Sequence, residues 1–238
     1  MATQASTILT AAINLSLSND GGATPLANDT TELLGVISRT VKQIYAQAGL
    51  PPSGGGGGYS NYFTRTTTLA LTSPATTPVA LPSNPTYAYI PTFTDAGGTV
   101  VSVVTLKDLH DGVAEYPPAI VVADGKAYSA GRQGDPTANA VLTLAGSYLP
   151  ADLTAPTDYI GATMVNDATT TAWPSQVGDP FLIYDLGLYL AEKDGARDAQ
   201  ELASLQQRRS DALDRLAQTI GLSQAQLSQV RPQAGSGH

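Results

Sequence analysis

Two kinds of hydrophobic pattern divide the chain, one typical of helices at both ends and one typical of strands between them. In residues 30–47 apolar side chains recur three or four positions apart, which is helical spacing. In residues 59–176 short runs instead alternate between apolar and polar positions, with turn residues between the runs. Helical spacing returns in residues 180–220. The pattern therefore predicts an α+β fold.

Residues 1–50 are predicted to hold two helices. The first covers residues 7–17 and ends where Asn-Asp-Gly-Gly breaks the apolar spacing. The second begins at Asp29-Thr30-Thr31-Glu32, where a capping residue precedes an acidic first turn, and it ends at Gly49 before two prolines. Its apolar stripe consists of Leu33, Ile37, Val41, Ile44 and Tyr45. Residues 51–58, which contain a run of glycines, are predicted to form a flexible linker.

Residues 59–176 are predicted to form a β sandwich or a barrel-like sheet. Strand-like runs separated by turn residues at short, regular intervals are typical of both architectures. Asp124-Gly125, placed between two such runs, is the strongest hairpin signal in the chain. The predicted strands are residues 63–71, 79–81, 87–90, 99–106, 119–123, 126–130, 140–144 and 159–165.

The C-terminal part, residues 177–221, is predicted to add two further helices. Gly178-Asp179-Pro180 indicates the first start, with Asp179 as the cap and Pro180 in the first helical position. The second helix covers residues 196–220 and ends at Gly221, and its apolar stripe consists of Leu202, Leu205, Leu213, Leu216 and Ile220. Residues 222–238 are predicted to form a short helix followed by an extended tail.

Because a lone amphipathic helix is marginal in water, these stripes must pack on one another. We therefore expect residues 30–47 to pack against both C-terminal helices. The result is a small helical bundle from the N- and C-terminal segments, with the β domain inserted between them.

Composition and charge exclude several classes of function. The chain of 238 residues has no cysteine, which removes disulfides and thiolate chemistry, and only two histidines. A formal net charge of −8 argues against a protein that grips the phosphates of nucleic acid. No apolar run reaches the length of a membrane span, so we expect no membrane partner.

Candidate chemical sites are few. Asp108-Leu109-His110-Asp111 joins a histidine to carboxylates, but no nucleophile or further metal ligand can be assigned to it, so a polar turn is the better interpretation. Arg208-Arg209 lies among interleaved acids and predicts an exposed, salt-bridged helix face. We therefore expect no catalytic site, no metal and no cofactor. A sugar-binding face remains an alternative, and it would use Tyr59, Tyr62, Tyr87, Tyr89, Tyr116 and Tyr128.

The segment with Leu149-Pro150-Ala151-Asp152-Leu153 leads to a Tyr-, Leu- and Ala-rich helix, Gly178-Asp179-Pro180-Phe181-Leu182-Ile183-Tyr184-Asp185-Leu186-Gly187-Leu188-Tyr189-Leu190-Ala191, and then to a longer charged helix. In its architecture the whole chain resembles the head-to-tail adaptor (connector, neck) proteins of tailed bacteriophages, most specifically in residues 180–220. In that family an N-terminal helix and C-terminal helices form a small bundle with β structure inserted between them.

The resemblance implies a structural virion protein at the head–tail junction. Such proteins form a ring, commonly of twelve subunits, beneath the portal protein and above a tail or nozzle protein, and packaged DNA passes through without specific binding. Their C-terminal segments often reach into the portal, a role that residues 223–238 match by position. Apolar spacing and charge predict the portal-docking residues Leu222, Leu227, Val230, Arg231, Pro232 and Gln233. The alternative is a tail-associated β module that binds carbohydrate or a host receptor.

Overall fold

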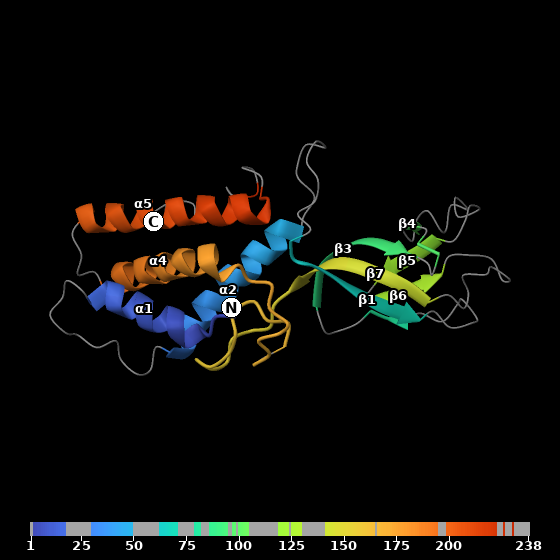
Figure 1. Ribbon diagram of the computed structural model, residues 1–238, viewed down its shortest axis with the longest axis horizontal. Helices are drawn as coiled ribbons and strands as arrows, with labels where there is room; N and C mark the ends of the chain where they lie inside the picture. Colours follow the sequence, from blue (N-terminus) through green and yellow to red (C-terminus); the bar gives the residue numbers. More distant parts are fainter. Residues whose placement is uncertain are drawn as a thin grey trace. The chain divides into compact units, whose positions relative to one another are not determined.

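The computed structural model describes residues 2–17, 30–49, 62–70, 79–81, 86–94, 97–98, 100–104, 119–123, 125–129, 141–164, 166–194, 199–222, 226 and 230. The chain divides into two compact units (Figure 1). The helical unit combines Met1–Phe63 with Leu149–His238, and the β unit is Thr64–Tyr148. The α+β class is confirmed, with a bundle built from both ends of the chain.

Helix α4 is the centre of the helical unit. The unit contains α1 (Ala5–Leu17), α2 (Thr30–Gly49), α4 (Ser175–Asp194) and α5 (Ala199–Ile220). Helix α4 contacts all three others, and Figure 1 shows it between α5 and α1. Its buried residues lie on several sides of the helix because it has a neighbour on each: Phe181, Leu182, Leu186, Leu188, Leu190 and Ala191. The expected packing of α2 against both C-terminal helices therefore holds chiefly for α4, on which α5 also packs.

The predicted stripes of α2 and α5 are buried. All five stripe residues of α2 are at most 2 % exposed, and Leu205, Leu213, Leu216 and Ile220 of α5 are at most 4 % exposed. Leu202 is partly buried against the cluster of Leu188, Ala191 and Leu205. Leu15 of α1 joins the same cluster, so three helices share it.

The predicted start of α4 is wrong. The helix begins at Ser175, where Gly178 N–H donates to Pro174 C=O at 2.8 Å, so Pro180 lies inside the helix. A proline there lacks the N–H that would complete the helical ladder. Pro180 is exposed, as is Gln176 four positions earlier. Asp179 is not the cap, because its carboxylate instead binds residues outside the helix.

Residues 150–164 and 166–174 belong to the helical unit, and the described residues 159–164 do not form the predicted strand 159–165. They form turns and extended stretches in the helical unit, with one isolated bridge between Gln4 and Tyr159. Their backbone groups bond to the N-terminal segment: Ala5 N–H donates to Asp158 C=O at 2.9 Å and Ile160 N–H donates to Thr3 C=O at 2.9 Å. The boundary of the β domain therefore moves from residue 176 to Tyr148.

The β unit contains one seven-stranded sheet in the order β1-β7-β3-β4-β5-β6-β2. Among the pairs whose register is described, β4–β5 is parallel, and β1–β7, β3–β4, β5–β6 and β2–β6 are antiparallel. The predicted hairpin joins β5 to β6, with Gly125 at φ 70° in its turn. The strands are β1 (Thr64–Ala70), β2 (Val79–Ala80), β3 (Thr86–Thr94), β4 (Val100–Val104), β5 (Ala119–Ala123), β6 (Lys126–Ser129) and β7 (Val141–Leu149).

The core of the β unit draws side chains from six strands into one cluster. It consists of Leu69, Phe93, Val101, Ile120, Ala127, Leu142 and Leu144, with Leu81 and Val122 packed against it. The strand order has two ends, β1 and β2, so among the described strands the sheet is open and does not close on itself as a barrel does.

Candidate functional site

The predicted docking segment begins at the end of α5. Gly221 has a φ of 72°, and Leu222 N–H donates to Ala217 C=O at 2.9 Å, which closes the helix as a Schellman motif does. Leu222 is half-buried and Val230 is buried at 4 % exposure. The remaining docking candidates, Leu227, Arg231, Pro232 and Gln233, lie outside the described residues.

Gln226 holds this segment against α2. Its side chain is buried, and Nε2 donates to the carbonyl of Gln47 at 2.6 Å. Gln47 lies in the last turn of α2, where backbone carbonyls have no partner within the helix. Gln226 therefore caps a helix that is distant in sequence, a role that no local pattern indicates. Val230, four positions further on, is also buried within the chain.

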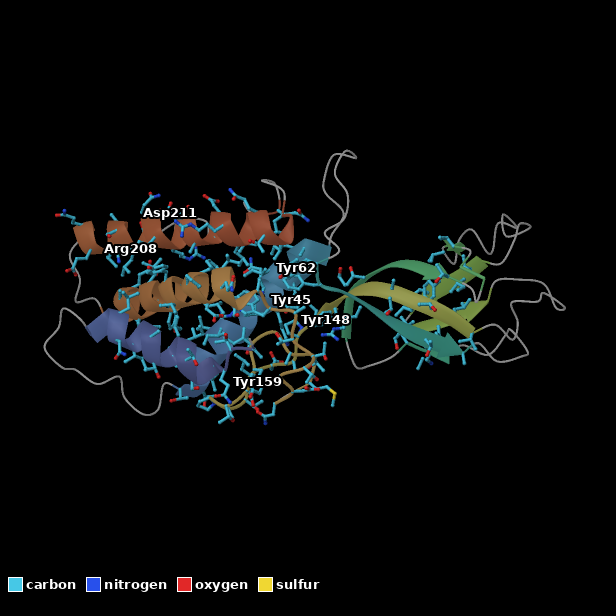
Figure 2. The ribbon with its side chains drawn as sticks, in the orientation of Figure 1. Tyr45, Tyr62, Tyr148, Tyr159, Arg208 and Asp211 are labelled. Atoms are coloured by element: carbon cyan, nitrogen blue, oxygen red, sulfur yellow. The ribbon has the colours of Figure 1, made fainter. Side chains whose placement is uncertain are left out.

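A buried ion pair joins the three longest helices. Arg209 of α5 places Nε 2.5 Å from Asp185 Oδ1 of α4, and Thr40 of α2 donates its hydroxyl to Asp185 Oδ2 at 3.0 Å. The guanidinium also lies 5.3 Å from the centre of the Phe181 ring. The predicted exposed face is right for Arg208, but Arg209 is buried at 8 % exposure. Arg208 and Asp211, both exposed, are labelled on α5 in Figure 2.

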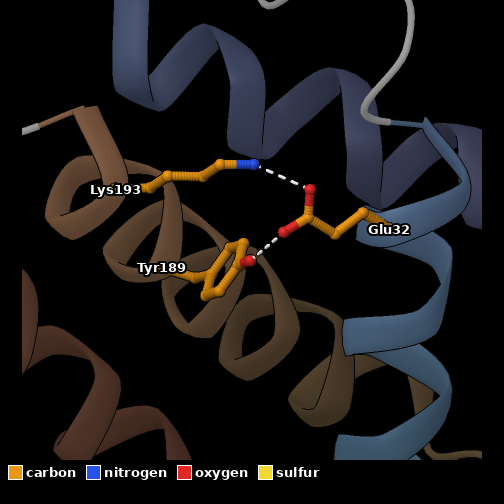
Figure 3. Close-up of polar contacts among 3 residues, drawn as sticks. All are labelled: Glu32, Tyr189 and Lys193. Carbon is orange, nitrogen blue, oxygen red and sulfur yellow. Dashed lines mark hydrogen bonds and ion pairs between the residues drawn. The ribbon is translucent and has the colours of Figure 1, made fainter.

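An exposed polar cluster ties the first turn of α2 to the last turn of α4 (Figure 3). The Tyr189 hydroxyl donates to Glu32 Oε1, and Lys193 Nζ donates to Glu32 Oε2 at 2.7 Å. The hydrogen bonds from Lys193 and then Tyr189 lower the pKa of Glu32, and the bond to Glu32 raises the pKa of Tyr189. Both bonds link a side chain of α4 to Glu32 of α2, so the cluster joins the two helices.

Asp158 organises the irregular segment between β7 and α4. It is 1 % exposed, and its Oδ2 accepts bonds from the N–H groups of Thr154 and Ala155 at 2.6 and 2.8 Å and from the Thr154 hydroxyl at 3.0 Å. Burial is the largest influence on its pKa and raises it, but these bonds together lower the pKa below its usual value. Oδ1 is buried without a hydrogen-bond partner among the described residues.

An aromatic stack supports the same segment. Figure 2 labels Tyr45, whose ring stacks on Phe63 with centroids 3.7 Å apart and whose hydroxyl donates to Gly161 C=O at 3.2 Å. A side chain at Gly161 would clash, because a Cβ there would lie 2.4 Å from the Tyr45 hydroxyl. Trp173 continues the stack with its centroid 6.4 Å from that of Tyr45.

Asp179 connects this stack to the N-terminal segment. It accepts bonds from Trp173 Nε1 at 3.0 Å and from the Thr3 hydroxyl at 2.6 Å. Burial is the largest influence on the carboxyl and raises the pKa of Asp179, against the lowering by these two bonds. The residue predicted as a helix cap is therefore a tertiary cross-link.

The tyrosine face considered for sugar binding is described only at Tyr62. That side chain is 41 % exposed and packs edge-on against Phe63 in the helical unit. The side chains of Tyr59, Tyr87, Tyr89, Tyr116 and Tyr128 lie outside the description, as does the segment 108–111 with His110.

In the described part of the chain, the polar clusters join helices and segments of the fold to one another. It contains no group of three or more His, Asp or Glu side chains placed to hold a metal ion. Within it, no helix has the length and apolarity to cross a membrane. Neither the protein-family models nor the curated proteins provide a match to the chain.

Proposed function

We propose that this chain is a subunit of a head-to-tail adaptor ring in a tailed bacteriophage. The ring lies beneath the portal, joins the capsid to the tail and surrounds the DNA channel. The observation that carries the proposal is the discontinuous helical unit, in which both ends of the chain pack around α4 while the β unit is inserted between Phe63 and Leu149. That is the architecture implied by the resemblance of residues 178–191 to this family.

The contacts within the helical unit support a static structural part. The Asp185–Arg209 pair, the Glu32–Lys193 pair and the Gln226 cap each join segments that are far apart in the chain. Such links favour one arrangement of the helices, which a subunit in a closed ring needs. No enzymatic activity and no cofactor are part of the proposal.

The surface of α5 is suited to a partner. Its buried stripe faces α4, and its other side exposes mixed polar and charged groups, including Arg208, Asp211 and Arg215. Interleaved charges of both signs can form pairs across a subunit contact without a large repulsive field. We assign the partners as other copies of the chain, commonly twelve in all, the portal protein and a tail or nozzle protein.

The net charge fits a channel through which DNA passes without specific binding. Each copy carries a formal charge of −8, so a ring has a negative field in its channel if the acidic side chains face the axis. Phosphates are repelled by such a field, which keeps DNA from adhering during packaging or ejection.

Native mass spectrometry of the full chain, alone and with purified portal rings, tests the proposal. The expected result is a ring of defined copy number that binds the portal end-on in electron micrographs. A chain that stays monomeric with portal rings would contradict it. The alternative, a tail-associated module for carbohydrate or a receptor, predicts instead that monomers bind glycans or host cells.

A further inference from the structure

The β sheet has an open edge at β1. β1 stands at one end of the strand order and pairs with β7 through all seven of its residues. Among the described residues, no strand pairs with its other side. In such a strand alternate residues direct N–H and C=O groups away from the sheet, which makes the edge a template for another strand.

β1 lacks the features that usually protect an edge strand. Its sequence, Thr-Arg-Thr-Thr-Thr-Leu-Ala, contains no proline, lysine or acid, and its register with β7 runs without a bulge. The one charged residue, Arg65, places its guanidinium 5.1 Å from the centre of the Tyr148 ring in the same unit. Nothing in the strand itself therefore opposes the addition of a further strand.

The outward side of β1 is small and uncharged. Thr66, Thr68 and Ala70 are exposed on this side, while Leu69 points into the core. Their partners on β7 extend the same surface: Ala145, Thr143 and Val141. Because each chain carries a net charge of −8, two copies repel one another on average. A strip without acidic side chains is where two copies can approach with the least repulsion.

We propose that β1 binds β1 of a second copy of this chain as an antiparallel pair, with a two-fold axis at Thr67. No like charges face each other in this register, and the threonine pairs are of a kind that stabilises sheets. One patch serves both copies, as a two-fold contact requires. The opposed pairs, each occurring twice, are Thr64–Ala70, Arg65–Leu69 and Thr66–Thr68.

This contact is separate from the proposed ring. A two-fold contact joins two copies and cannot by itself close a ring, which needs head-to-tail contacts. The inference therefore does not rest on the proposed function, and each can fail alone.

A single introduced cysteine tests the register, because the chain has no cysteine of its own. Thr67→Cys places two thiols opposite each other at the axis, where Cα atoms are about 4.5–5.5 Å apart, within the span of a disulfide. Under mild oxidation the full-length variant should become mainly a covalent dimer on a non-reducing gel. Val100→Cys is the control, since Val100 is 63 % exposed but lies on β4. No covalent dimer from Thr67→Cys, or an equal yield from both variants, overturns the proposal.

Paired charge changes test the contact without cysteine. Thr66→Glu with Thr68→Glu puts like charges opposite each other, whereas Thr66→Lys with Thr68→Glu puts opposite charges there. Both positions are exposed, so both variants should keep the wild-type thermal melt. In sedimentation experiments the first should weaken the dimer by about tenfold or more, and the second should restore it. Dimerisation that is unaffected by the first pair, or equally weak with both, overturns the proposal.

Discussion

Two carboxyl groups of the helical unit have pKa values shifted in opposite directions, because one is richly hydrogen-bonded and the other is dominated by burial. The pKa of Asp158 is lowered by the bonds from Thr154 and Ala155. The pKa of Asp179 is raised, since burial outweighs the bonds from Thr3 and Trp173. Neither role could be predicted from sequence, because the partners of Asp179 lie in separate segments and the turn around Asp158 has no distinctive spacing.

Replacing Asp158 by Asn should destabilise the protein by about 2–3 kcal/mol at pH 7. A neutral amide oxygen in place of Oδ2 accepts the three bonds more weakly than a carboxylate does, and the amide NH2 would then take the place of Oδ1, which is buried without an acceptor among the described residues. Because the pKa of Asp158 is lowered in the folded protein, the unfolded state binds more protons between the two pKa values. The stability that Asp158 contributes is therefore full above its unfolded pKa and is lost as pH falls through its folded pKa. Urea unfolding from pH 7 to pH 3 checks this. Asp211→Asn, at an exposed position, is the control and should change little.

Asp179 should show the reverse dependence on pH. With its pKa raised, the native state binds more protons than the unfolded state between the two pKa values, so its contribution to stability falls as pH rises through that interval. Asp179→Asn should therefore destabilise the protein less at pH 7 than Asp158→Asn does. It should also reduce the loss of unfolding free energy as pH rises through that interval. The same urea series measures both variants. An Asp179→Asn variant that loses stability selectively at neutral pH would contradict the assignment.

At the scale of elements, periodic spacing predicted α2 and α5 well, because each has one buried stripe and one exposed side. It failed at the start of α4, where the Asp179-Pro180 signal resembles a helix start but Ser175 begins the helix. It also failed for residues 159–165, whose backbone partners lie at the N-terminus. A local sequence pattern can predict an amphipathic helix, but it cannot predict a segment whose backbone hydrogen bonds go to residues far away in the sequence.

A charge on the buried stripe of α5 should unfold the helical unit. Leu205 and Leu216 are at most 4 % exposed, so an Asp at either position is buried without a partner. We expect each substitution to cost more than about 3 kcal/mol of unfolding free energy. Gln206→Asp, on the exposed side of the same helix, should cost less than about 0.5 kcal/mol. Thermal melts compare the three, and equal melting temperatures would exclude this packing.

The Arg209–Asp185 pair should show strong coupling. Arg209→Met leaves the Asp185 carboxylate without its buried counter-ion, which costs about 3–5 kcal/mol in comparable pairs. Adding Asp185→Leu removes that stranded charge and should recover much of the loss. Arg208→Met, its exposed neighbour in sequence, is the matched control. Additive losses in the double variant would show that the pair does not act as a unit.

At the scale of the whole molecule, the insertion of the β unit between two helical segments was predictable from the change of hydrophobic period. The boundary at Tyr148 was not, because residues 149–174 have strand-like composition but bond to the N-terminal segment and to α2. The tail posed the same difficulty. Its apolar spacing could be read from the sequence, but the sequence did not indicate that Gln226 and Val230 pack against the chain's own helices or core.

Two truncations separate the stabilising part of the tail from the part proposed to dock on the portal. Removing residues 222–238 deletes the Gln226 cap and buried Val230, so it should cost about 2–4 kcal/mol of stability. Removing only residues 231–238 keeps both and should leave the thermal melt unchanged. We expect this shorter truncation to abolish portal binding in pull-downs, since it deletes Arg231, Pro232 and Gln233. If it binds portal rings as well as the full chain, docking resides elsewhere on the subunit, and the exposed side of α5 becomes the surface to change next.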